Sequence, residues 1–276
     1  LIDLLAGRTD VCSWVHERHG LIGLGRVLTV EARGDERIEA LRTAWRSVVG
    51  AAWWRDALVR PGTGPVALGA ITFSPASELA SVILVPEVLI GRDDDGAWLT
   101  TVMSAASEGT GPAHPDPQAL IKTLVARART ALGQEHAHGG SDPDEARAAV
   151  ERGGVRGETG VLSEEQWCRA VADVQERMHS GRARKVVLAR DVLTYPSAPV
   201  ATGTVLRRLT ADYPSTWTFA VDQMVGASPE LLLRLRDRRL MSRVLAGTAR
   251  RRTGEDALAT ARLAAWLEGS EKNNRE

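Results

Sequence analysis

The stretch GASPELLLRLRDRRLMSRVLAGTARR, residues 226–251, decides how this chain folds. Two largely apolar runs, Glu230–Leu235 and Leu240–Leu245, flank the polar pair Asp237–Arg238. Short β-favouring runs on either side of such a pair predict a β-hairpin. Just upstream, Trp217–Val221 carries large apolar residues at every second position, which predicts another strand. The region is therefore expected to consist of strands joined by tight turns.

Helices flank these strands along the sequence. Ser163 and Gln166 form a capping-box pattern ahead of an amphipathic helix that Gly181 ends. In Arg37–Val49 the apolar residues recur at spacings of three and four, which predicts a second helix. Further helices are predicted over 118–134, 204–211 and 255–269, and further strands over 20–30, 66–73, 81–85, 97–103 and 185–190. The chain is therefore expected to mix helices and strands.

The composition changes near the middle of the chain. Residues 136–160 (HAHGGSDPDEARAAVERGGVRGETG) are dominated by Gly, Ala and charged side chains. Such a composition is typical of a mobile linker. We therefore expect an N-terminal α/β part over 1–135, a linker over 136–160 and a second region over 161–276.

Charge and cysteine content exclude several classes of protein. The chain has 276 residues, with 35 Lys plus Arg and 35 Asp plus Glu, so no broad field attracts nucleic acid or an anionic membrane. The apolar run Val82–Val85 is far shorter than the ~20 residues that span a bilayer. With only Cys12 and Cys168, no disulfide framework or zinc spacing can form, and the cytoplasm is the expected location.

Several polar residues could carry chemistry, and each also fits a structural role. Lys185 could be a surface lysine at the start of a strand, Glu230 a turn acid and Gly247 a bulge. Glu276 could belong to a solvated helix face. Gly23–Gly25 suggests a dinucleotide-binding turn, but the third glycine and a ribose-binding acid are missing, so a plain turn is favoured.

Taken together, four segments resemble the chorismate-utilising enzymes, and most closely isochorismate synthases of menaquinone or siderophore type. The match is in residue type, order and separation. It covers residues 160–276, and extends more loosely to Trp14–Gly25. The resemblance implies an α+β fold of large, mostly antiparallel sheets with helices packed outside, and makes 161–276 the first part of the chorismate-binding catalytic region. The four segments are KVVLAR (185–190), GASPELLL (226–233), VLAGTARR (244–251) and SEKNNRE (270–276).

The resemblance assigns an acid–base pair. Lys185 matches the lysine of family members that add water, and is implied to be the general base that activates water for attack at C2 of chorismate. Glu230 matches the general acid that protonates the departing C4 hydroxyl. Their ordinary pKa values, ~10.4 and ~4.3, have to move in opposite directions for these roles. A dry pocket would lower the pKa of the lysine and raise the pKa of the glutamate. We therefore expect Lys185, Glu230 and Gly247 to line one ring-sized cavity.

The remaining assignments concern substrate and metal. Gly247 and Thr248 match the segment that contacts the substrate, where glycine permits a close approach and the hydroxyl can donate to a substrate oxygen. Glu276 matches a Mg²⁺ ligand of the family, and oxygen ligands suit this ion. Asn273 stands where many members carry an acid, so the resemblance gives no auxiliary ligand there.

The implied activity is the Mg²⁺-dependent conversion of chorismate to isochorismate. Lys185 disfavours an aminating enzyme, so we expect a monomer without an amidotransferase subunit. Two alternatives remain: a salicylate synthase, which goes on to release pyruvate, and a non-catalytic binding protein on the same fold. Family members continue for well over a hundred residues beyond the position of Glu276. The resemblance therefore implies that the C-terminal part is absent, and that these 276 residues alone are inactive.

Overall fold

The computed structural model of the chain describes residues 1–104, 116–137, 155–196, 199–236, 238–245, 249 and 257–270. The chain divides into two compact units. Unit 1 comprises Leu1–Leu132 and Ala201–Glu276, and unit 2 comprises Gly133–Val200. All strand pairs in the described residues are antiparallel, and helices accompany them, which confirms the predicted fold class.

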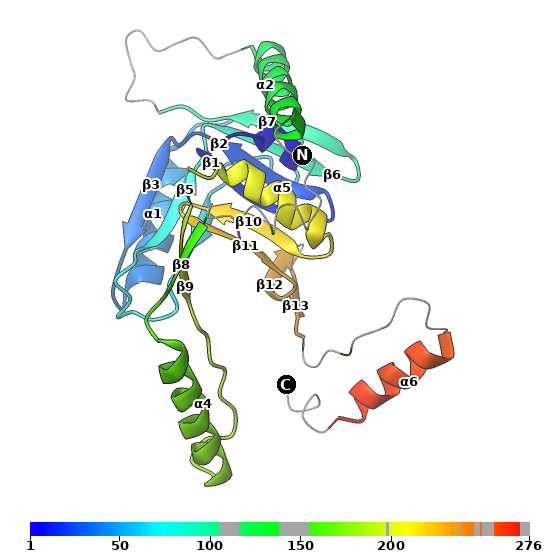
Figure 1. The fold of residues 1–276 in the computed structure, drawn as a ribbon. Helices are drawn as coiled ribbons and strands as arrows, with labels where there is room; N and C mark the ends of the chain where they lie inside the picture. Colours follow the sequence, from blue (N-terminus) through cyan, green and yellow to red (C-terminus); the bar gives the residue numbers. More distant parts are fainter. Residues whose placement is uncertain are drawn as a thin grey trace. The chain divides into compact units, whose positions relative to one another are not determined.

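A six-stranded sheet forms the centre of unit 1 (Figure 1). Its strand order is β11–β10–β1–β2–β6–β7. Strand β1 (Val11–His16) pairs with β10 (Trp217–Val221), so two segments far apart in the sequence lie side by side inside the sheet. The strand predicted from the alternation at 217–221 is therefore confirmed. The other four strands are β2 (His19–Leu24), β6 (Val88–Asp93), β7 (Gly96–Thr101) and β11 (Met224–Ser228).

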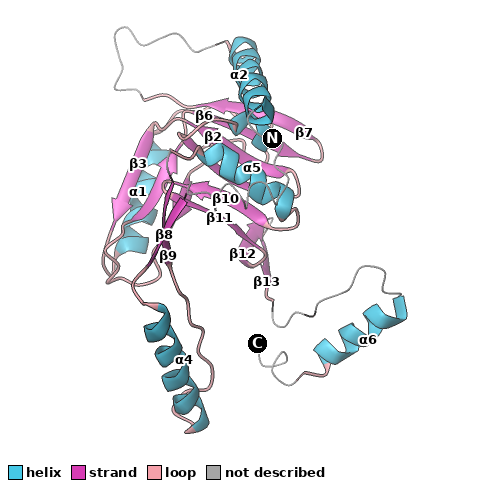
Figure 2. Cartoon of the chain, in the orientation of Figure 1, coloured by secondary structure: helices cyan, strands magenta, loops and turns pink. Residues whose placement is uncertain are grey.

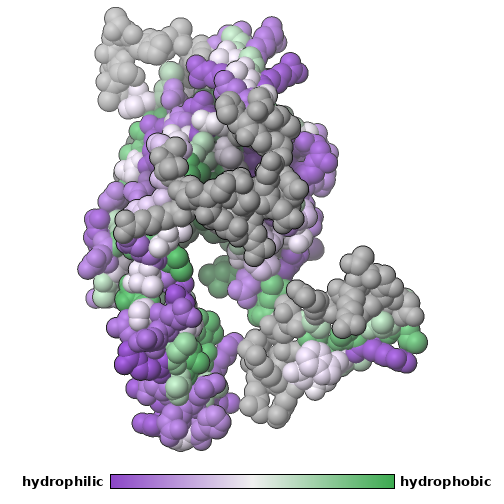
Figure 3. All heavy atoms as spheres, viewed as in Figure 1, coloured by the Kyte–Doolittle hydropathy of each residue, from purple (hydrophilic) through white to green (hydrophobic). Residues whose placement is uncertain are grey.

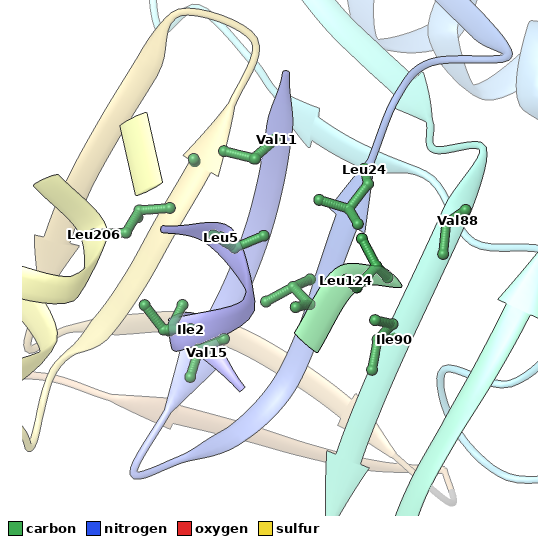
Figure 4. Close-up of a cluster of buried hydrophobic side chains, with 11 residues drawn as sticks. Ile2, Leu5, Val11, Val15, Leu24, Val88, Ile90, Leu124 and Leu206 are labelled. Carbon is green, nitrogen blue, oxygen red and sulfur yellow. The ribbon is translucent and has the colours of Figure 1, made fainter. Parts of the chain in front are cut away.

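Helices cover one face of this sheet. Strand residues alternate between faces, so Val11 and Val15 of β1 point to the same side. There they pack with Leu5, Leu124 and Leu206, which come from three separate helices (Figure 4). This apolar contact fixes the helical layer on the sheet. The three helices are η1 (Ile2–Leu5), α2 (Pro117–Ala137) and α5 (Thr202–Asp212).

One glycine allows two of these helices to touch. The Gly203 N–H donates to the Arg8 carbonyl oxygen at 3.0 Å, and a Cβ built on Gly203 would overlap the Leu5 carbonyl oxygen. A residue without a side chain is needed wherever two backbones approach so closely. Because α5 also packs on β10 and β11, this contact supports the strands that lead to Glu230.

A second, smaller sheet covers part of the opposite face. Cys12 and Val221 point away from the helices and pack against Leu84. The sheet has the order β3 (Leu28–Ala32), β5 (Ser81–Val85) and β4 (Leu68–Ala70). The predicted helix α1 is confirmed over Arg37–Ala51 and packs on β3 and β5. Its buried first residue, Arg37, donates hydrogen bonds to three backbone carbonyls, which satisfies the charged group.

The predicted hairpin is present. Strands β12 (Leu231–Arg236) and β13 (Arg239–Arg243) pair on either side of Arg238, whose φ of 63° is a turn conformation (Figure 2). Leu231 is buried, whereas the other described side chains of the two strands are exposed. The last predicted helix is also found in the described residues, as α6 (Ala257–Glu268).

Unit 2 contains a long helix, α4 (Glu164–His179). The predicted capping box is confirmed, since the Ser163 hydroxyl accepts from the Gln166 N–H and the Gln166 side chain accepts from the Ser163 N–H. Figure 3 shows a largely hydrophilic α4 with a hydrophobic strip along it. Neither α4 nor any other helix in the described part of the chain has the length and apolarity that crossing a membrane requires.

One expectation for unit 2 is wrong, and another stays a prediction. The segment 185–190 is not a strand, because β-branched residues form a strand only where a partner supplies hydrogen bonds. The strand begins later, as β9 (Val192–Pro196), and pairs with β8 (Val155–Thr159). The five residues of β8 lie within the predicted linker at 136–160, which stays a prediction. Residues 138–154 of that linker lie outside the described residues.

Candidate active site

The turn Ser228–Pro229–Glu230 leaves the end of the six-stranded sheet. Ser228 is the last residue of β11 and pairs with Trp217. Its hydroxyl accepts a hydrogen bond from the Glu230 N–H at 3.2 Å, which holds the backbone of the turn. Pro229 has no N–H to continue the ladder, so the strand ends here. The exposed Glu230 side chain is thereby carried on a short, hydrogen-bonded turn at the sheet end.

A buried indole lies next to this turn. Trp217 is 8% exposed, and its ring stacks on the His16 ring with centroids 4.2 Å apart and planes inclined by 21°. The Cζ atom of Arg243 lies 4.8 Å from the centre of the same indole. His16 pairs with Trp217 between β1 and β10, whereas Arg243 belongs to β13 and pairs with Leu231. The Trp217 side chain therefore contacts both a residue of the neighbouring sheet strand and a residue of the hairpin.

Lys185 lies in the other compact unit. It is in the segment without regular structure between α4 and β9, and its side chain is exposed. Glu230 lies in unit 1. The expected cavity between Lys185 and Glu230 therefore involves both units and stays a prediction.

The other predicted site residues are Gly247, Thr248 and Glu276, and all three lie outside the described residues. Within the described part of the chain, no group of three or more His, Cys, Asp or Glu side chains could hold a metal ion. The assignments of these three residues to substrate and to Mg²⁺ stay predictions.

Sequence reasoning missed the residues around Trp217. The alternation at 217–221 predicted the strand but not its neighbour, since β1 and β10 are far apart in the sequence. Likewise, the irregular register between β12 and β13 decides that Arg243 stands opposite Leu231. The sequence signal that could have indicated these contacts was the run of arginines in the hairpin. A hairpin that only faces solvent does not need so much positive charge.

The fold defines an α+β protein of layered antiparallel sheets, with a carboxylate presented at a sheet end beside a buried indole. Residues 12–276 match the family described as chorismate binding enzyme. This is nearly the whole sequence, so the chain belongs to the chorismate-binding enzyme family.

Individual relatives include isochorismate synthases. The chain is 26% identical over 253 residues to isochorismate synthase MenF of Bacillus subtilis, covering 86% of this chain and 50% of the relative. It is 25% identical over 282 residues to the salicylate biosynthesis isochorismate synthase of Pseudomonas aeruginosa, covering 98% and 54%. The solved structure of the menaquinone-specific isochorismate synthase MenF of Escherichia coli is similar in fold, with a TM-score of 0.56 at 21% identity over 99% of this chain and 57% of that one. The chain therefore spans about half the length of these relatives.

Proposed function

We propose that the full-length protein is an isochorismate synthase, which converts chorismate to isochorismate. The observation that carries the proposal is Lys185 in a chain related to isochorismate synthases. Family members that add water have a lysine at this place, and those that add ammonia usually have glutamine. The proposal includes chorismate as the substrate and a cytoplasmic location.

The chemistry assigns one proton transfer to each of two side chains. Lys185 takes a proton from water as the water oxygen bonds to C2. The ring double bonds shift, and the C4–O bond breaks as Glu230 gives its proton to the leaving hydroxyl. One water enters and one leaves, so the reaction is an isomerisation without change of oxidation state. The hydrogen-bonded turn that carries Glu230 supports its role, because a general acid works only within reach of the atom it protonates.

The substrate is proposed to lie against Gly247 and Thr248. The Thr248 hydroxyl would donate to a substrate oxygen, and Gly247 would leave room for the ring. When bound, Mg²⁺ supplies Lewis-acid attraction to a substrate carboxylate. Glu276 is the residue proposed to hold the ion, through a carboxylate of the kind that Mg²⁺ prefers.

Two variants of the full-length protein test the acid–base pair. Lys185→Ala removes the base and is expected to lower turnover by roughly 10²-fold or more, with a much smaller effect on chorismate binding. Glu230→Gln keeps the shape of the side chain but cannot deliver an acidic proton, so turnover should fall while the fold survives. Near-normal turnover of either variant, measured by chromatography of isochorismate, would remove that residue from the mechanism.

The products distinguish the rival functions. A salicylate synthase releases pyruvate, which a coupled lactate dehydrogenase assay detects, whereas an isochorismate synthase does not. A binding protein on this fold would bind chorismate in calorimetry and give neither product. Isochorismate without pyruvate is the result expected.

A further inference from the structure

The backbone on both sides of Glu230 is linked to one residue, Trp217, on one side through strand pairing and on the other through its indole. On the N-terminal side, Ser228 pairs with Trp217 across β10 and β11. On the C-terminal side, Leu231 pairs with Arg243, whose guanidinium lies over the indole at 4.8 Å. Glu230 thus lies between two residues that are both linked to Trp217.

The Arg243 contact joins the hairpin to the central sheet. The described side chains of β12 and β13 are exposed apart from Leu231, so the hairpin has little buried surface of its own to fix its direction. A planar guanidinium stacks well on an indole, and the attraction grows as water is excluded. Trp217 is buried whereas Arg243 is exposed, so the contact is shielded from water on the side of the indole only.

His16 holds the indole from the central sheet. Its ring is stacked on Trp217, and its Nε2 atom is buried without a hydrogen-bond partner among the described residues. The imidazole therefore acts here through ring packing. With its position fixed by the β1–β10 pairing, it gives the indole a fixed neighbour in the central sheet.

We propose that Arg243, held on Trp217, is a positioning residue that fixes Glu230 for delivery of its proton. The proposal rests on the proposed function, which makes Glu230 the general acid. Without the contact, β12 and β13 could swing about Ser228, and the Glu230 carboxyl would spend less time in line with the leaving hydroxyl. Proton delivery belongs to the chemical step, so the loss should appear in kcat and not in KM.

The test uses three variants of the full-length protein. Arg243→Leu removes the cation and is expected to lower kcat by ~10-fold with KM unchanged, the rate equivalent of a partly desolvated cation–π contact. Arg243→Lys keeps a cation over the indole and should restore kcat to within about threefold of the wild type. Arg239→Leu is the matched control, since Arg239 lies on the same strand at the other end of the hairpin and is exposed. It should leave kcat unchanged.

Hydrogen–deuterium exchange gives a second measurement that needs no turnover. The amides of Glu230 and Leu231 should exchange faster in Arg243→Leu than in Arg239→Leu, and Arg243→Lys should restore slow exchange. Equal kcat losses in the two leucine variants, or unchanged exchange at Glu230 in Arg243→Leu, would overturn the proposal. Absence of isochorismate formation by the wild type would refute the proposed function instead, and the exchange pattern would still decide whether Arg243 holds the turn.

Discussion

Replacing Gly203 by alanine tests the contact between η1 and α5. The new Cβ would overlap the Leu5 carbonyl oxygen and lie 2.5 Å from its carbonyl carbon. That is about 1 Å or more inside the usual 3.5–4.0 Å between carbon atoms. Both atoms are backbone and cannot rotate away, so α5 has to move. The movement would also weaken the 3.0 Å hydrogen bond from the Gly203 N–H to Arg8.

The change in the free energy of unfolding can be estimated from the clash, the weakened hydrogen bond and the helix propensity of alanine. Overpacking of a well-packed core costs about 1–3 kcal/mol, and a backbone clash belongs at the upper end of that range. A lost hydrogen bond adds roughly 1 kcal/mol, while the better helix propensity of alanine offsets a similar amount. We therefore expect the free energy of unfolding to fall by about 3 kcal/mol. At 2–4 °C per kcal/mol, this is a drop in Tm of roughly 6–12 °C.

Calorimetry of the full-length protein measures the effect, and Gly50→Ala is the control. Gly50 is also a helical glycine, in α1, but a Cβ there would meet no atom within 4 Å. That variant should be stabilised by about 0.5–1 kcal/mol. If Gly203→Ala melts at or above the temperature of the wild type, the close approach of η1 and α5 is not a constraint on the fold.

The remaining predictions concern two ionisable groups. Burial raises the pKa of the Cys12 thiol from 9.0 to about 12, so at pH 8 a thiol reagent should label the exposed Cys168 and reach Cys12 only on unfolding. Labelling of both thiols at one rate in the folded protein would contradict the burial of Cys12. The raised pKa also makes stability depend on pH. Its contribution to the free energy of unfolding is fully present below pH 9 and should be lost as the pH rises from 9 towards 12. Donation from the Thr63 hydroxyl at 2.7 Å, with help from two backbone N–H groups, holds the pKa of Asp56 below its ordinary 3.8. Its contribution to stability is present above pH 3.8 and lost as the pH falls through the lowered value. Thr63→Val should raise this pKa in an NMR titration, and an unchanged titration curve would show that the hydroxyl has no such role.

Local features of the fold could be predicted from the sequence. Ser163 and Gln166 predicted a capping box that the structure contains, because both hydrogen bonds form within one helical turn. The hairpin around Arg238 was equally predictable, since a tight turn decides its pairing. The strand expected at 185–190 was wrong, because a strand depends on a partner that its own residues do not specify.

The candidate site was predictable only in part. Glu230 followed from its resemblance to a family segment, which needs no knowledge of the fold. The contacts that surround it did not follow, since His16 of β1 is far in sequence from Trp217 and Arg243, with which it is brought together. Long-range register depends on the whole sheet, and residue types in a single strand do not encode it.

The pairing of β1 with β10 imposes a delay between the synthesis of β1 and the formation of this strand pair. Ser13 stands opposite Ala220, so β1 leaves the ribosome long before its neighbour exists. At ~5–20 residues per second, β1 waits for roughly 10–40 s with one edge unpaired. Such an edge can pair with another nascent chain, and contacts of this high contact order form slowly even when both strands are present. The strand order thus leaves one edge of β1 open to wrong pairing until β10 has been made.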